Sequence, residues 1–280
     1  MRIDNSGLAF RAGMTQKMKN EIKSCDVKKI QRDVWNRGIQ CDFKQNKVVA
    51  WCSQKVVELI EEINKRYGLD LGLPKGIIVE DFKELDLSID NYDIVHGCIN
   101  LMPCKFYKKK DIIVSNGTIF FNEHVNKNYS GGNEFWDKLD ENADKFYAEK
   151  GAATDFFLEL ILHEFAHAMH EKNLQTKLSP KKLNKFWDWQ CSLKTQMKFK
   201  HKYGEIMSKI SNYANTDHSE AVACDISKRL IENIDKETLK PTSNFFENSP
   251  YNISLIRQYF SSHPDKEMNI MLKKTWDGKR

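Results

Sequence analysis

The sequence predicts an α+β protein in which helical portions precede and follow a β-sheet. Stretches with apolar residues at every third or fourth position lie towards both ends of the chain, and short strand-like segments gather between residues 76 and 122. A helix that is apolar nearly all round follows these strands at about 158–170, as is typical of a buried helix. We expect 1–74 to be an N-terminal tail and helical region, and 75–280 to be the domain that carries the function.

Two long helices are expected in the N-terminal region. The first should run from Thr15 to about Arg37, because apolar residues recur there at helical spacing, namely Met18, Ile22, Val27, Ile30 and Val34. The second should run from about Lys47 to Tyr67, with Gly68 as its C-terminal cap. These helices form either a small subdomain or a layer packed behind the sheet.

The strand candidates lie in the middle of the chain, at 77–79, 95–102, 111–115 and 118–122. The last two are separated by Asn116-Gly117, which favours a tight hairpin between them. A short helix is expected at about 81–85, and a longer one at about 134–150.

More helices are expected in the second half. The buried helix should begin after Gly151, with Thr154 as its N-cap, and Ser179-Pro180 should break the chain beyond it. A lysine- and aromatic-rich helix should continue through Leu193, with an interruption at Tyr203-Gly204, and a last helix should run from about His218 to Asn233.

Composition excludes several functions. The net charge of +5 comes from scattered lysines without the aromatic or glycine interleaving of a nucleic-acid site, so we expect no nucleic-acid partner. No apolar run is long enough to span a bilayer, and the N-terminus lacks a signal-peptide core, so we expect no membrane partner. Seven cysteines without C-x-x-C spacing predict a reducing compartment. The protein should be cytoplasmic, or exported by a route without a cleavable signal peptide.

The sequence His163-Glu164-Phe165-Ala166-His167 carries the clearest chemical signal. Four residues turn a helix by about 400°, so the two histidines lie about 40° apart on one face and can reach one Zn²⁺. Glu164 can then accept a proton from water on the metal, which attacks a carbonyl group. The competing interpretation is a pair of hydrogen-bonded core histidines beside a glutamate at a solvated edge.

A third protein ligand is needed, and Glu220 is the best candidate. His170 shares the face of the two histidines, but it lies about 10 Å along the helix from His163, whereas ligands must lie about 2 Å from the ion. Glu220 is expected in the first turn of the last helix, from which it can approach from the opposite side. Alternatively, Glu220 is only the capping-box partner of Asp217. If Glu220 is not a ligand, His218 and Asp217 are next in line.

Residues around Glu220 suggest further roles. Tyr213 lies seven positions earlier, and its phenol could donate a hydrogen bond to the oxyanion that develops during hydrolysis. His218 is the alternative donor. Asp225 is a candidate to hold one of the ligating histidines through its second ring nitrogen.

The combination of H-E-F-A-H-A with Y-A-N-T-x-x-x-E-A-x-A resembles the gluzincin metallopeptidases, and particularly the lethal-factor type of bacterial zinc peptidase domain. The resemblance covers about residues 75–235, and only its two short motifs are specific. It implies a zincin-like fold, in which a mixed sheet packs on the zinc-motif helix and its edge strand, here 118–122, aligns the substrate. The aspartate that thermolysin-like enzymes carry four residues after the third ligand is replaced by Cys224.

These observations lead to a functional prediction. We expect a zinc metalloendopeptidase with one Zn²⁺ per chain, held by His163, His167 and Glu220, that acts on a peptide or protein substrate. Glu164 would be the general base and Tyr213 the oxyanion donor. The alternative is a regulatory zinc-binding protein of the same fold whose peptidase activity is gated or lost. A purely structural zinc site would use a fourth protein ligand, usually cysteine, and no cysteine pair lies near the motif.

Overall fold

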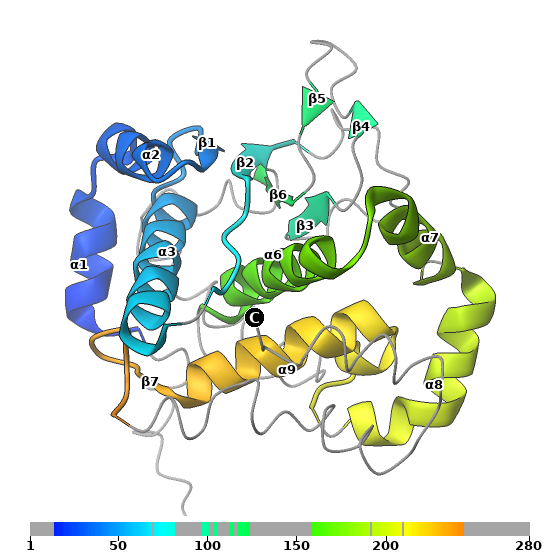
Figure 1. Cartoon of the computed structure of the whole chain (residues 1–280). Helices are drawn as coiled ribbons and strands as arrows, with labels where there is room; N and C mark the ends of the chain where they lie inside the picture. Colours follow the sequence, from blue (N-terminus) through cyan, green and yellow to red (C-terminus); the bar gives the residue numbers. More distant parts are fainter. Residues whose placement is uncertain are drawn as a thin grey trace, which may run out of the picture.

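The structure is a computed structural model (Figure 1), and it describes residues 14–68, 70–81, 97–100, 104–105, 113–114, 117–123, 158–190, 192–208 and 210–243. Within these residues helices and a four-stranded sheet share one fold, so the predicted α+β class is confirmed. None of the described helices is long and apolar enough to cross a membrane.

The main sheet has the strand order β1-β2-β6-β3. Strands β1 (Gln40–Asp42), β2 (Gly76–Glu80) and β6 (Thr118–Asn122) are parallel, whereas β3 (Gly97–Asn100) runs antiparallel to β6. Two short pairs accompany it: β4 (Cys104–Lys105) with β5 (Ile113–Val114), and β7 (Ile234–Asp235) with β8 (Lys240–Pro241). The predicted strand at 77–79 is therefore confirmed as part of β2.

Two predictions about β6 are wrong. Thr118–Asn122 is an interior strand between β2 and β3 rather than the edge, and all five of its residues are buried. Its central residues Ile119, Phe120 and Phe121 form a continuous apolar run, which suits a strand covered on both faces. The predicted hairpin also fails, because β6 pairs with β2 and β3 while β5 pairs with β4. Gly117 adopts a positive φ of 79°, but it leads into a different pairing.

The predicted first helix is in fact two, α1 (Gln16–Ser24) and α2 (Val27–Asn36). Cys25 is extended, and the side chain of Asp26 accepts a hydrogen bond from the N–H of Lys29, which begins a new helix. An aspartate N-cap of this kind stabilises a helix start by about 1 kcal/mol. Periodicity alone hid the break because the apolar spacing continues across it.

Helix α3 (Lys47–Tyr67) matches its prediction, including Gly68 at its end with a left-handed φ of 62°. This helix, the strands and the later helices contribute to one hydrophobic core, in which Ile60, Ile77, Phe165 and Leu230 are all buried. Strand β1, from the N-terminal region, joins the same sheet as β2. The N-terminal helices thus pack as a layer on the sheet-containing part of the molecule, one of the two arrangements expected.

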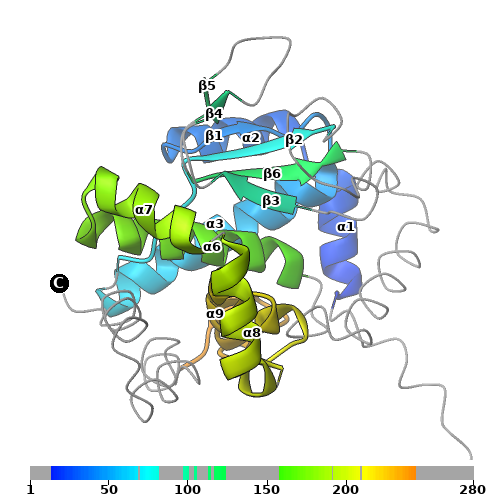
Figure 2. The ribbon, with the colours of Figure 1, turned by 90° about the vertical axis from the view of Figure 1, so that its right-hand side faces the viewer.

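Helix α6 (Glu159–Lys177) lies between the sheet and α9 (His218–Glu232) in both views (Figures 1 and 2). It contacts β3 and β6 on one side and α9 on the other, which explains why its sequence is apolar nearly all round. The predicted last helix is confirmed as α9. The N-cap position of α6 is Leu158, and Thr154, the predicted cap, lies outside the described residues.

Two helices connect α6 to the 3₁₀ turn η3 (Tyr213–Asn215): α7 (Pro180–Gln190) and α8 (Leu193–Met207). The predicted helix through Leu193 is therefore divided after Gln190. The predicted interruption at Tyr203-Gly204 is wrong, because α8 continues through both residues. Tyr203 is buried in the core, and this burial outweighs the cost of about 1 kcal/mol for a glycine inside a helix.

Several predicted elements cannot be compared with the structure. The helix at 134–150, nearly all of the helix at 81–85, and parts of the strands at 95–102 and 111–115 lie outside the described residues. Within the described parts of those two strands, Gly97–Asn100 and Ile113–Val114 are extended as expected.

Candidate metal centre

Helix α6 presents two imidazoles on the side that faces α9. His163 and His167 are one turn apart, and their rings meet edge to face with centroids 4.8 Å apart. Both histidines are buried, with 9% and 5% of their surface exposed. Two imidazoles removed from water in this way need polar partners, because an unpaired buried polar group costs about 1–3 kcal/mol.

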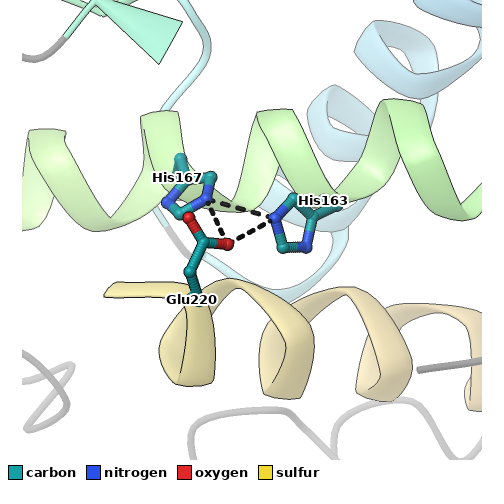
Figure 3. A group of neighbouring side chains, drawn as sticks. All are labelled: His163, His167 and Glu220. Carbon is teal, nitrogen blue, oxygen red and sulfur yellow. Dashed lines mark hydrogen bonds and ion pairs between the residues drawn. The ribbon is translucent and has the colours of Figure 1, made fainter. Parts of the chain in front are cut away.

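Helix α9 brings Glu220 to the same point. The carboxylate of Asp217 accepts hydrogen bonds from the N–H groups of Ser219 and Glu220, which fixes the first turn of α9. Asp217 therefore caps the helix, as the alternative interpretation of Glu220 required. The Glu220 side chain, however, contacts the two histidines (Figure 3). The predicted ligands thus come together in one group.

The three potential ligand atoms form a compact triangle. Glu220 Oε2 lies 3.0 Å from His163 Nε2 and 3.3 Å from His167 Nε2, and the two nitrogens lie 3.2 Å apart. Donor atoms about 2.0–2.1 Å from one ion at tetrahedral angles lie about 3.3 Å from each other. The spacing therefore suits three corners of a tetrahedron around one metal ion, and His163, His167 and Glu220 form a group that could hold one.

The electrostatics of the group favour a bound cation. Burial alone would raise the pKa of Glu220, but the nearby His167 and His163 lower it well below the usual range, so this carboxylate is ionised. Burial alone would lower the pKa of His163, but Cys224 and then the Glu220 carboxylate raise it well above the usual histidine value. Without a metal, a proton on His163 balances the negative charge of Glu220. A metal ion can replace that proton.

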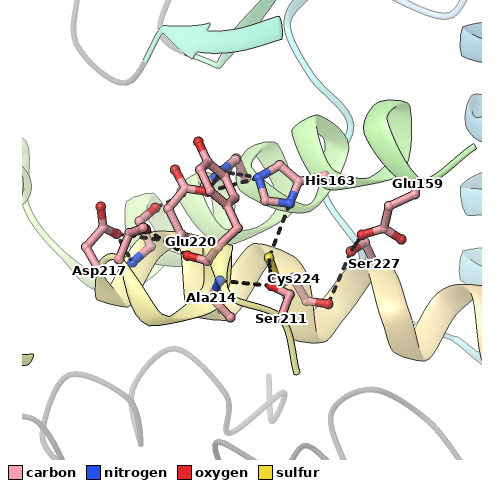
Figure 4. A network of polar contacts seen from close by, with 12 residues as sticks. Glu159, His163, Ser211, Ala214, Asp217, Glu220, Cys224 and Ser227 are labelled. Carbon is pink, nitrogen blue, oxygen red and sulfur yellow. Dashed lines mark hydrogen bonds and ion pairs between the residues drawn. The ribbon is translucent and has the colours of Figure 1, made fainter. Parts of the chain in front are cut away.

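The other ring nitrogens of the two histidines also have partners, which the sequence did not reveal; Figure 4 shows the one at His163. Ser219 Oγ lies 3.2 Å from His167 Nδ1, and Cys224 Sγ lies 3.7 Å from His163 Nδ1. Both partners come from α9. The Nδ1 atoms thus meet Ser219 and Cys224 and not Asp225, the predicted partner, which lies 3.8 Å from Arg229. The position of Cys224 four residues after Glu220 was the available signal, since this spacing places both on one helix face.

Glu164 lies next to the first histidine and is partly exposed, unlike the histidines themselves. Burial raises the pKa of its carboxyl group, while the positive charge that His163 and His167 can carry lowers it and Glu220 raises it further. The net shift is upward, towards the range in which a carboxylate accepts a proton efficiently near neutral pH. Glu164 therefore has a raised proton affinity and follows the first of the two histidines on α6.

Tyr213, on η3, is a close neighbour of the group. Its ring lies 5.6 Å from the ring of His163, and 41% of the residue is exposed. The carboxylate of Glu220, then burial, and then Glu164 raise the pKa of the phenol, so it keeps its proton and can donate a hydrogen bond. Tyr213 is thus an exposed neighbour of a group whose histidines are buried.

His218 and His170 lie apart from the group. His218 is 2% exposed and His170 is 3% exposed, and their rings are 6.0 Å apart among the aromatic side chains of Phe186, Trp187 and Phe199. The alternative roles of His218, as third ligand or oxyanion donor, therefore find no support. His170 also lies outside the group, in agreement with the distance argument.

Metal affinity should fall as the pH falls. In the metal-free protein the pKa of His163 is raised above the usual histidine value, so a proton on this ring competes with an ion at higher pH than on a free histidine. That proton must leave before Nε2 can bind an ion, so below this pKa each unit of pH lost should raise the zinc Kd by about tenfold for one competing proton. Competition with a chelator between about pH 8 and pH 6, corrected for the protonation of the chelator itself, measures the slope. A zinc Kd that stays constant over this window would contradict the assignment.

The comparisons with known proteins add no family. We found no match to this chain among protein-family models, curated proteins or solved structures. The assignment of the candidate site therefore rests on geometry alone. The site combines a buried pair of histidines on α6, a carboxylate on α9, and contact partners for the Nδ1 atoms of both histidines.

Proposed function

We propose that this protein is a zinc-dependent metalloendopeptidase with a zincin-like fold. The observation that carries the proposal is the triangle of His163 Nε2, His167 Nε2 and Glu220 Oε2, with sides of 3.0–3.3 Å. Glu164 follows His163 on the same helix, and all three members of the triangle influence the pKa of its carboxyl group. Two imidazoles and one carboxylate are a ligand set typical of catalytic zinc, and three protein ligands leave one coordination position open. A general base beside the ligands would have no use in a structural site.

Zinc is favoured over other ions by the donor atoms. Imidazole nitrogen suits zinc and the later transition metals, whereas calcium and magnesium prefer oxygen ligands throughout. No described cysteine belongs to the ligand group: Cys224 contacts the Nδ1 side of His163, away from the Nε2 atoms that converge. This arrangement supports a catalytic site with an open position and not a closed structural one.

The residues of this chain can perform hydrolysis in a simple division of roles. His163, His167 and Glu220 would hold the zinc ion, which when bound would lower the pKa of a water molecule and polarise the substrate carbonyl. Glu164 accepts the proton of the attacking water and delivers it to the leaving amine. Tyr213 donates a hydrogen bond from its protonated phenol to the oxygen that becomes negative. The partly exposed position of Tyr213 supports this role, because a substrate must reach the site from solvent.

The substrate is proposed to be a peptide in an extended conformation. Among the described strands, β3 lies at the edge of the main sheet next to β6, and it packs against α6, which carries the histidines. A peptide can add to such an edge through main-chain hydrogen bonds, as in other cases of β-augmentation. Gly97–Asn100 thus replaces the segment 118–122 as the proposed substrate-aligning strand.

The proposal predicts about one Zn²⁺ per chain and cleavage of peptide bonds. Metal analysis of protein reconstituted with zinc and dialysed gives the stoichiometry, and an unbiased peptide library analysed by mass spectrometry detects cleavage. The Glu164→Gln protein, prepared in parallel, controls for contaminating proteases. Stoichiometry near zero would refute the zinc site. Zinc near one per chain without cleavage of any peptide would instead favour a regulatory zinc-binding protein.

A further inference from the structure

Helix α9 contacts both ligating histidines on the side away from the ligand triangle. Ser219 Oγ is 3.2 Å from His167 Nδ1, and Cys224 Sγ is 3.7 Å from His163 Nδ1. Ser219 and Cys224 are themselves buried, with 6% and 1% of their surface exposed. These two residues flank Glu220 in the sequence of α9. One helix therefore supplies a ligand atom and touches the second nitrogen of each histidine on the other helix.

The proton on each ring decides whether a metal can bind. A neutral imidazole carries one N–H, and its Nε2 atom binds an ion only when the proton is on Nδ1. An acceptor next to Nδ1 favours that tautomer and fixes the ring orientation. A hydroxyl and a thiol can each accept a hydrogen bond, so Ser219 and Cys224 can both serve as this acceptor.

The sulfur of Cys224 is also held from its other side (Figure 4). Ser211 Oγ accepts a hydrogen bond from the N–H of Ala214 at 2.9 Å and donates to Cys224 Sγ at 3.4 Å. Ala214 belongs to η3, the turn that carries Tyr213. A continuous chain of polar contacts therefore connects the turn of the proposed oxyanion donor to the first ligating histidine.

We propose that Ser219 and Cys224 are positioning residues that hold the Nδ1 atoms of His167 and His163, so that α9 orients all three metal ligands. This inference presupposes the zinc site of the proposed function. It assigns to a serine and a cysteine the task that a carboxylate, a backbone carbonyl or water commonly performs in zinc proteins. Because a thiol is a weak acceptor, the orientation of His163 should be held less firmly than a carboxylate would hold it.

The proposal makes a directional prediction about zinc affinity. Loss of a residue that orients a ligand typically costs 10–100-fold in metal affinity. Cys224→Ala should therefore raise the zinc Kd by about tenfold, and Ser219→Ala by a similar factor. Cys224→Asp should bring the zinc Kd back to the wild-type value or below it, because a carboxylate is a stronger acceptor for Nδ1–H and increases the basicity of the ring.

The experiment compares these three variants with two matched controls. Cys52→Ala removes a buried cysteine of α3, and Ser227→Ala removes a buried hydroxyl of α9 that donates to Glu159. Competition with a fluorescent chelator gives the zinc Kd of each full-length protein. The visible spectrum of the Co²⁺-substituted protein reports the geometry of the ligands, and thermal melting in excess chelator measures stability without metal. We expect weaker zinc binding and an altered Co²⁺ spectrum in Cys224→Ala and Ser219→Ala, but not in the controls.

The possible results separate the two proposals. If the wild-type protein binds no zinc, the proposed function fails. If the wild-type protein binds zinc and both alanine variants keep its zinc Kd and Co²⁺ spectrum, only the positioning role is refuted. Lower melting temperatures with unchanged affinity would likewise assign the two residues to packing alone. Should Cys224→Asp fail to fold, the Ser219→Ala result and the Cys224→Ala spectrum still decide the matter.

Discussion

Replacing Glu220 with alanine should raise the zinc Kd by about 10³-fold. Zinc sites of proteins contribute about 10–16 kcal/mol of apparent binding free energy, and one of three protein ligands carries about a third of it. Glu220 is the one anionic member of the described group, and its Oε2 lies 3.0–3.3 Å from both Nε2 atoms, so its loss leaves only the two imidazoles of that group. Competition with chelators of graded strength covers the required range of affinity.

A matched variant separates the ligand role from helix capping. Asp217→Ala removes the side chain that caps α9 and should cost about 1 kcal/mol of stability. It should change the zinc Kd far less than Glu220→Ala does. Equal effects of the two variants on affinity would show that Glu220 acts through the start of the helix. Unchanged affinity in Glu220→Ala would remove this residue from the ligand set altogether.

Replacing Glu164 with glutamine should abolish most hydrolysis while zinc stays bound. The amide has nearly the same size as the carboxylate but cannot accept the proton of the attacking water. The loss of a general base costs about 10²–10⁴-fold in rate. Glu164 is not a member of the ligand group, so the zinc stoichiometry should remain at the wild-type value. Initial rates on the best peptide from the library, with metal analysis of the same sample, test both statements.

Glu171→Gln is the suitable control for this experiment. Glu171 is also a buried carboxyl group on α6, but it accepts hydrogen bonds from Gln175 and Trp187, outside the ligand group. Its replacement should leave the rate within a few-fold of wild type. If Glu164→Gln retains comparable activity, Glu164 is not the base, and another group must accept the proton.

The local elements of the site followed from the sequence alone. The spacing of His163 and His167 on a helix, the start of α9 after Asp217 and the end of α3 at Gly68 all depend on contacts within a few residues. Helical periodicity, N-capping and left-handed glycines are properties of such short segments. The choice of Glu220 as third ligand was also available, because metal chemistry requires a carboxylate or an equivalent donor near the helical pair.

The pairing and order of the strands depend on contacts between distant segments, and only the tertiary structure decided them. The sequence favoured a hairpin at Asn116-Gly117 and an edge position for 118–122, yet β6 is interior, because its pairing is set by packing against β2 and β3. Turn residues permit a hairpin but do not choose the partner strand.

The surroundings of the candidate metal group were settled in the same way. From their spacing in the sequence, Asp225 and His218 were as plausible as neighbours of the two histidines as Ser219 and Cys224 were. Their roles were decided by the rotation of α9 against α6, which turns Ser219, Glu220 and Cys224 towards the histidines and buries the ring of His218 among aromatic side chains. Spacing along one helix fixes which residues share a face. Only the packing of two helices fixes which face of α9 meets the two histidines of α6.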